Sequence, residues 1–188
     1  MTMKNAETLR KMLLENGASR AEIIVADQVA YDVSFRDMCA QNSCGRYGKC
    51  HMCPPDVGDI HALIARAKAY AGGVFYQKIY TIEDSFDFEG MMDARRAQSA
   101  LAFSLDEKAR EMLNPGFLHL SVGGCGLCKT CTREENLPCR YPDKALASLE
   151  AYGVDVYNTA KNAGMKYVNG ENTITYFGIF LLKGDQNG

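Results

Sequence analysis

The sequence predicts an α/β or α+β fold, with helices packed on a single sheet of about four to five strands and cysteine-rich loops at one side. Two observations predict this fold class. Segments of strand periodicity alternate with segments of helical periodicity along the chain. In addition, both groups of cysteines follow a predicted strand and lie in segments that contain Gly and Pro, which places them in loops on the same side of the sheet.

The N-terminal half contains four predicted elements. Residues 5–15 form an amphipathic pattern that predicts a helix, and residues 21–35 are rich in β-branched and aromatic side chains, which favours a strand or a hairpin. That segment leads to the first cysteine group. A helix over residues 60–67 follows the group, and a strand over residues 74–82 comes next.

The C-terminal half continues the alternation. A long helix after Asp84-Ser85 is expected to end at Asn114-Pro115-Gly116, and residues 117–122 form a strand that runs into the second cysteine group. A helical stretch from about residue 143 to 163, interrupted near Gly153, precedes a final strand over residues 173–182. With 188 residues and no long linker, residues 1–188 are expected to form a single domain.

Composition narrows the classes of function. The formal net charge of −2 and the sequence pI near 5.9 offer no general attraction to nucleic acid or to an anionic membrane, so neither is an expected partner. The first residues lack the apolar core of a signal peptide, and no apolar run is long enough to span a bilayer. We therefore expect a cytoplasmic protein, in which closely spaced cysteines are metal ligands or redox thiols more often than disulfides.

All eight cysteines fall in two groups, which makes a packing role for the whole set improbable. We take all eight as candidate ligands of a metal cofactor, in a single metal-binding, iron–sulfur domain. The first group is Cys39, Cys44, Cys50 and Cys53, and the second is Cys125, Cys128, Cys131 and Cys139.

The spacing in the second group favours iron–sulfur clusters. Its C-x2-C-x2-C run wraps a short loop around one corner of a 4Fe-4S cubane, as in bacterial ferredoxins. The fourth ligand of such a cluster is either Cys139 or the Cys53-Pro54 step in the other group. Two clusters are the preferred number. Zinc is the alternative metal, since it takes four cysteine ligands in structural sites, although three cysteines in a C-x2-C-x2-C run fit zinc poorly.

Other interpretations have less support from the residues. Cys50 and Cys53 have the spacing of a dithiol redox pair, but Pro54-Pro55 follows where such a site starts a helix. His51 lies among the cysteines and either replaces one as a ligand or points to solvent, and solvent is the expectation; His119 is expected at a packing or surface position in a strand. Ser148, Glu150, Gly153 and Asp155 form a polar cluster that could approach a substrate, but helix capping and solvation are the favoured explanation.

The cysteine motifs resemble those of an uncharacterised family of predicted metal-binding proteins, found mainly in anaerobic bacteria and archaea. One motif, C-x4-C-x2-Y-G-x4-C-P-P, is represented by Cys39, Cys44, Tyr47, Gly48, Cys53, Pro54 and Pro55. The other joins G-G-C-x2-C-x2-C to P-C-R-x-P and S-x-E-A-x-G-x-D-V, and spans Gly123 to Val156 with Cys125, Cys128, Cys131 and Cys139. The resemblance implies metal binding but no substrate or reaction, and Cys50 is not a usual member of its pattern.

Three hypotheses for function follow. In the first, the clusters transfer electrons to a redox partner protein. In the second, a group with only three thiolates leaves one iron open, so that a cluster-dependent enzyme acts on a small-molecule substrate whose identity the residues do not reveal. In the third, structural zinc stabilises a surface that binds another protein.

Overall fold

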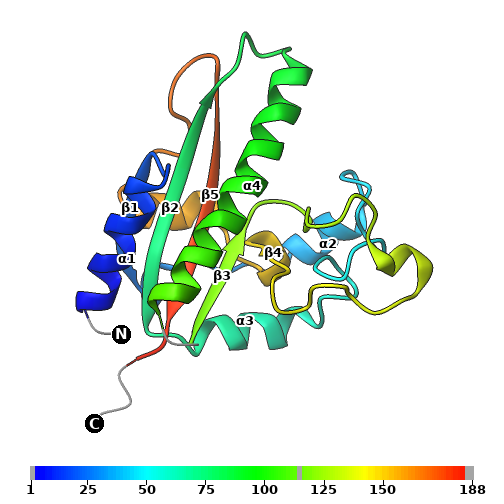
Figure 1. Ribbon diagram of the computed structural model, residues 1–188, viewed down its shortest axis with the longest axis horizontal. Coiled ribbons are helices and arrows are strands. Elements are labelled where there is room, and N and C mark those ends of the chain that lie inside the picture. The colour runs from blue at the N-terminus through cyan, green and yellow to red at the C-terminus, as the bar shows by residue number, and fades with distance from the viewer. Residues whose placement is uncertain (1–2, 114–115, 185–188) are drawn as a thin grey trace.

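A computed structural model describes residues 3–113 and 116–184. Five strands form one mixed sheet in the order β1-β2-β5-β3-β4 (Figure 1). All neighbouring strands pair antiparallel except β3 and β4, which are parallel. The strands are β1 (Arg20–Val25), β2 (Gly72–Thr81), β3 (Phe117–Ser121), β4 (Ala147–Ser148) and β5 (Thr173–Leu182). The predicted fold class is thus confirmed: a single sheet with helices packed on it and cysteine-rich loops at one side.

Helices cover both faces of the sheet. On one face lie α1 (Met3–Glu15) and α4 (Phe88–Met112), and on the other lie α3 (Ile60–Lys68), α5 (Val156–Asn162) and the short 3-10 turn η3 (Glu150–Tyr152). Aspartates cap three of these helices by accepting a hydrogen bond from a backbone N–H in the first turn. They are Asp59 for α3, Asp87 for α4 and Asp155 for α5.

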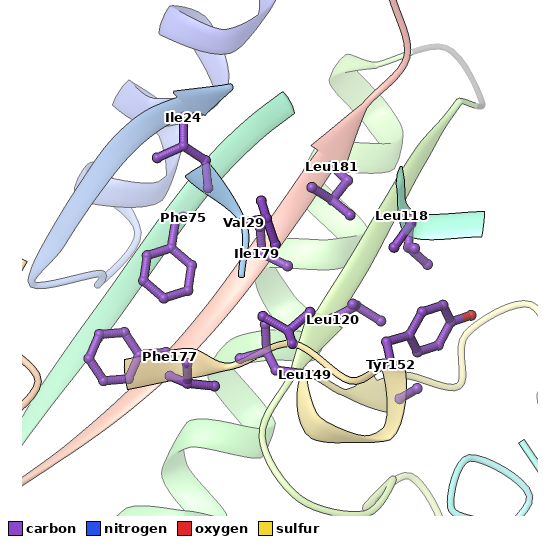
Figure 2. Packing of buried hydrophobic residues seen from close by; sticks show 14 of the residues in the cluster. Ile24, Val29, Phe75, Leu118, Leu120, Leu149, Tyr152, Phe177, Ile179 and Leu181 are labelled. Carbon is purple, nitrogen blue, oxygen red and sulfur yellow. The ribbon is translucent and has the colours of Figure 1, made fainter. Parts of the chain in front are cut away.

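The hydrophobic core consists of two clusters separated by the sheet. Alternation along β2 and β5 sends Phe75 and Ile179 into one cluster, and Tyr76 and Phe180 into the other. The first cluster, shown in Figure 2, also contains Leu149 and lies on the face of α3 and η3. Because all these side chains are nearly fully buried, the sheet is stabilised from both faces.

Two predicted elements differ from the structure. The strand over residues 21–35 is shorter, because a 3-10 turn at Ala26–Gln28 ends β1, and a short helix, α2 (Phe35–Ala40), follows and contains Cys39. Residues 143–163 do not form one interrupted helix. Their first part pairs with β3 through β4, and the left-handed conformation of Gly153, with φ 68°, separates this part from α5.

The remaining predicted helices and strands are present within a few residues of the expected bounds. The expected stop at Asn114-Pro115 lies outside the described residues. Within residues 3–113 and 116–184, no helix has the length and apolar character needed to cross a membrane.

Candidate metal centre

Apart from Cys39, which lies on α2, the cysteines of the two groups lie in loops that meet beside the edge of the sheet formed by β3 and β4 (Figure 1). The first loop leaves α2 and runs to α3, and the second leaves the end of β3 and returns to β4. The loops are far apart in the sequence, but cysteines from both line one pocket. The expectation that both groups lie on the same side of one sheet is therefore confirmed.

A small pocket between the loops is lined by cysteines from both groups. Cys50 comes from the first loop, and it joins the four cysteines of the second loop, Cys125, Cys128, Cys131 and Cys139. Cys50 is only 1% exposed. Met52, Leu127 and Ala145 complete an apolar wall around these thiols, together with Tyr141. Five thiols in an apolar pocket are donors of the kind that bind thiolate-ligated metals, so the chemistry of the donor set suits an iron–sulfur cluster or zinc.

The other three cysteines of the first group do not line this pocket. Burial is the main cause that raises the pKa of Cys39, and the hydrogen bond to Cys50 is the main cause that raises the pKa of Cys53. Charge repulsion from Cys44 raises the pKa of both thiols further, so Cys44 lies close to each of them. Cys44 is exposed, whereas Cys53 is 9% exposed. Cys39, Cys44 and Cys53 therefore lie near one another, and the hydrogen bond between Cys53 and Cys50 links them to the five-thiol pocket.

Cys50 and Cys53 share a hydrogen bond between their side chains. This bond is the main cause that lowers the pKa of Cys50 to about 6, and the backbone N–H groups of Met52 and Cys125 lower it further. The same bond raises the pKa of Cys53. A hydrogen bond from Cys53 to Cys50 accounts for both directions, because it stabilises the thiolate form of Cys50 and the thiol form of Cys53.

Glycine at position 124 allows the two loops to approach closely. A Cβ atom at this position would lie 3.1 Å from Sγ of Cys53 and 3.3 Å from Cγ of Arg46. Both contacts are tighter than ordinary van der Waals packing, so a larger residue would push Cys53 or Arg46 away. Gly124 thus places the backbone of the second loop directly against a thiol of the first.

Side chains also tie the loops together. Asp56 of the first loop and Arg133 of the second form an ion pair, and His51 donates from Nε2 to the carbonyl oxygen of Leu137 at 2.9 Å. Thr132, which is buried beside His51, donates from Oγ1 to the carbonyl of Pro138. The expectation that His51 points to solvent is wrong, because its ring is held by the second loop.

Ser148 and Asp155, two members of the polar cluster that follows the second cysteine group, have structural roles. Asp155 caps α5, and Oγ of Ser148 accepts a hydrogen bond from the N–H of Ala151 at 3.0 Å. Glu150 differs from its expected solvated position, since burial raises the pKa of its carboxyl and its charge acts on Cys39. It therefore lies near the first cysteine group.

A buried polar network lies under the second loop, on the face covered by α4. The hydroxyl of Tyr76 donates to Nε2 of His119 at 3.0 Å, and Nδ1–H of His119 donates to Asp106 at 3.2 Å. Arg110 donates to the other oxygen of Asp106 at 2.5 Å. Burial lowers the pKa of His119, so its contact with Asp106 is a hydrogen bond from a neutral imidazole rather than an ion pair.

Sequence patterns gave no signal for this network. Tyr76 lies on β2, His119 on β3 and Asp106 on α4, and an isolated histidine in a strand is uninformative. The expected packing position of His119 is consistent with its 4% exposure.

No three Cys, His, Asp or Glu side chains in the described part of the chain are arranged as ligands of a single metal ion. The thiols instead line the wall of a pocket. A mixed sheet that carries two cysteine-rich loops around a thiol-lined pocket defines a class of cysteine-rich α+β protein. Within that class the chain belongs to a specific family, because residues 22–182 match the family described as "Predicted metal-binding protein (DUF2284)". This match confirms the resemblance to a family of predicted metal-binding proteins.

Comparisons with curated proteins and with solved structures find no match.

Proposed function

We propose that this protein is an iron–sulfur protein that transfers electrons to a partner protein in the cytoplasm. The observation that carries the proposal is the pocket lined by Cys50 and the four cysteines of the second loop. When bound, an iron–sulfur cluster supplies one-electron redox chemistry at a potential set by burial and by hydrogen bonds to sulfur. Membership of a family of predicted metal-binding proteins supports the metal-binding part of this function.

Under this proposal the eight thiols serve two clusters. Four of the five cysteines that line the pocket would hold a first 4Fe-4S cluster, and the C-x2-C-x2-C spacing favours Cys125, Cys128 and Cys131 among them. Cys139 and Cys50 compete for the fourth position. Cys39, Cys44 and Cys53, which do not line that pocket but lie near one another, would hold a second cluster, with Cys50 as the additional donor if Cys139 serves the first.

The protein around these thiols contributes charge compensation and exclusion of water. Arg46 lowers the pKa of Cys50 and opposes the rise at Cys53, although the hydrogen bond between the two thiols is the larger influence on both. Backbone N–H groups of Met52 and Cys125 donate to Cys50, and that of Leu127 donates to Cys125. Such donors stabilise negative charge on sulfur and raise the reduction potential of a bound cluster.

The test is the metal and acid-labile sulfide content of anaerobically purified protein, with an electron paramagnetic resonance spectrum after dithionite reduction. About eight iron and eight sulfide per chain, with the signal of reduced cubanes, is the expected result for two 4Fe-4S clusters. Zinc in stoichiometric amount without sulfide would overturn the redox function and leave a structural zinc protein that presents a binding surface.

A matched pair of variants tests the division of ligands. Cys128→Ser removes a thiol from the five-cysteine pocket, and Cys39→Ser removes one from the other set. Each variant is expected to lose about half of the iron and one of the two cluster signals in the electron paramagnetic resonance spectrum. The lost signal should differ between the two variants. Loss of all iron in both variants would contradict two separate clusters.

One observation favours a second candidate function, a cluster-dependent enzyme with an open iron site. Cys39, Cys44 and Cys53 supply only three thiolates unless Cys50 joins them, and Cys44 also lines a larger pocket that opens to solvent. A Cys50→Ser variant discriminates between the two functions. Unchanged iron content would mean that Cys50 is not a ligand and that one cluster has an open position, whereas loss of iron would favour two fully ligated clusters and electron transfer.

A further inference from the structure

A pocket of about 630 Å³ lies between α4 and the cysteine loops, and the proposed function does not account for it. One wall is a stripe on α4 with helical spacing, from Met92 through Arg95, Arg96 and Ser99 to Phe103. The opposite wall consists of Cys44, Arg46 and the Gly124 to Leu127 segment of the second loop. The volume is within the range of pockets that hold small organic molecules.

The polar groups of this pocket are strongly biased toward positive charge. Three guanidinium groups, those of Arg46, Arg95 and Arg96, line it, and no described carboxylate does. Arg96 forms an ion pair with Asp93 one turn earlier on α4, but neither Arg46 nor Arg95 has a carboxylate partner among the described residues. Arginines without partners in a concave site favour a bound anion, because the guanidinium matches carboxylate and phosphate groups with two parallel hydrogen bonds.

Arg46 and Arg95 enter the pocket from different sides. The charge of Arg46 acts on Cys50 and Cys53, and its stem lies beside Gly124 and the Cys53 thiol, so it belongs to the cysteine side. The charge of Arg95 acts on Tyr176 of β5, where it opposes the effect of burial. Its guanidinium lies 3.5 to 3.9 Å from the position that a Cβ on Gly123 would take, so it faces the pocket from the α4 side.

We infer that this pocket binds a small organic anion, whose carboxylate or phosphate group contacts Arg95 and Arg96 and whose apolar part packs on Met92, Phe103 and Leu127. Ser99 adds a hydroxyl near the anionic group. Cys44 lies in the same pocket, so the ligand would sit beside the first cysteine group. The inference goes beyond the proposed function, because anion binding requires neither a particular metal nor electron transfer.

The binding test uses holoprotein and four probes in isothermal titration calorimetry. Phenylacetate and phenyl phosphate carry the two alternative anionic groups, phenylacetamide is the neutral isostere of phenylacetate, and inorganic phosphate lacks an apolar part. Saturable binding of one or both aromatic anions, with the amide and inorganic phosphate bound at least about tenfold more weakly, is the expected result. Failure of both aromatic anions to bind saturably at about 10 mM overturns the inference.

Two matched pairs of variants locate the site. Arg95→Gln should weaken binding about tenfold or more, whereas Lys108→Gln, which removes the same charge from an exposed position on the same helix, should leave it unchanged. Ala100→Glu puts a carboxylate into the pocket and should abolish binding, whereas Ala97→Glu adds the same residue at an exposed position outside it. Equal effects within either pair overturn the inference.

Metal and sulfide are measured in the same samples, so that the two proposals fail separately. Ala100→Glu changes no cysteine and is expected to retain the full metal content. Loss of anion binding with unchanged metal supports a separate anion site. If Arg95→Gln and Ala100→Glu instead lose metal together with anion binding, then the arginines serve the metal centre and the anion site is rejected. Zinc in place of iron leaves the anion inference intact and rejects only the proposed redox function.

Discussion

At the scale of single residues, the hydrogen-bonded chain from Tyr76 through His119 to Asp106 is buried against the main sheet. Tyr76 is fully buried, and the imidazole of His119 stacks on Phe180 with ring centroids 3.7 Å apart. Every member depends on the next for a partner, and a buried polar group without a partner costs about 1 to 3 kcal/mol. The network therefore ties α4 to β2 and β3, below the second cysteine loop.

Replacement of Asp106 tests this dependence. Burial raises the pKa of Asp106, but hydrogen bonds from His119 and Arg110 outweigh burial and hold the pKa below its usual value. Asp106→Asn should lower the free energy of unfolding by about 2 kcal/mol, because it removes the charged acceptor of both bonds. Urea unfolding at pH 7 measures the change. Glu107→Gln, on the exposed face of the same helix, is the control and should cost less than about 0.5 kcal/mol.

Because His119 is neutral in the folded protein, the free energy of unfolding should depend on pH. Its pKa in the folded protein lies below the unfolded value of about 6.5, so the stability that its burial provides is complete above about pH 6.5 and is lost as the pH falls through the folded pKa. The urea midpoint of the wild type should therefore decrease between pH 7 and pH 5. His119→Gln, which cannot gain a proton, should show a smaller decrease, and an equal decrease in both would contradict the assignment.

Replacing Gly124 or Gly126 by alanine compares a glycine in close contact with the first loop with a glycine in ordinary packing. Gly124→Ala places Cβ against Sγ of Cys53, whereas Gly126→Ala meets only the side chain of Ser99 at 3.7 Å. Neither glycine has a positive φ, so backbone strain is not a difference between them. Gly124→Ala should release metal faster in a chelator challenge, while Gly126→Ala should behave like the wild type. Equal rates in the two variants would reject the contact with Cys53 as a determinant of metal retention.

Residue spacing predicted some of these features and not others. The cysteines are informative because their ligand pattern is local, and C-x2-C-x2-C can be recognised within a few residues. The positions of Cys50 in the pocket of the second group and of His51 beneath Leu137 depend on how two distant loops meet. No local pattern carries that information.

At the scale of elements, the two cysteine loops have little regular structure and are held by side-chain contacts instead. The ion pair between Asp56 and Arg133 is the main charged link, and both side chains are partly shielded from solvent, at 20% and 28% exposure. A double-mutant cycle with Asp56→Asn and Arg133→Gln should give a coupling free energy of about 1 kcal/mol in thermal unfolding. The exposed pair of Lys144 and Glu107 should couple by less than about 0.5 kcal/mol.

The two incorrect element predictions have a common physical cause. Residues 146–149 are buried without interruption, and this pattern fits a helix in the core as well as a strand. The pairing of Ser148 with Ser121 decides between them, and it joins segments that only the folded sheet brings together. In the same way Tyr31 pairs with Val154 through an isolated bridge rather than extending β1. Long-range pairing overrode local propensity in both segments.

At the scale of the whole molecule, the sheet divides the core into two parts that have different relations to the metal centre. Leu149 belongs to the cluster on the face of η3, and its N–H donates to the carbonyl of Ser121 at 2.9 Å, next to the start of the second loop. Leu105 belongs to the cluster beneath α1 and α4. Both side chains are essentially fully buried, at 1% and 0% exposure. Replacing either leucine by alanine should therefore leave a similar cavity, one on each face of the sheet.

We expect Leu149→Ala and Leu105→Ala each to lower the free energy of unfolding by about 3 kcal/mol, because both remove a buried leucine from a packed cluster. Only Leu149→Ala should also weaken metal retention, since Leu149 supports the segment from which the second loop departs and to which it returns. Urea unfolding of the metal-free proteins gives the first quantity, and metal per chain after dialysis against a chelator gives the second. Parallel loss of metal in both variants would mean that retention follows global stability, and that the centre depends on the whole fold rather than on one face of the sheet.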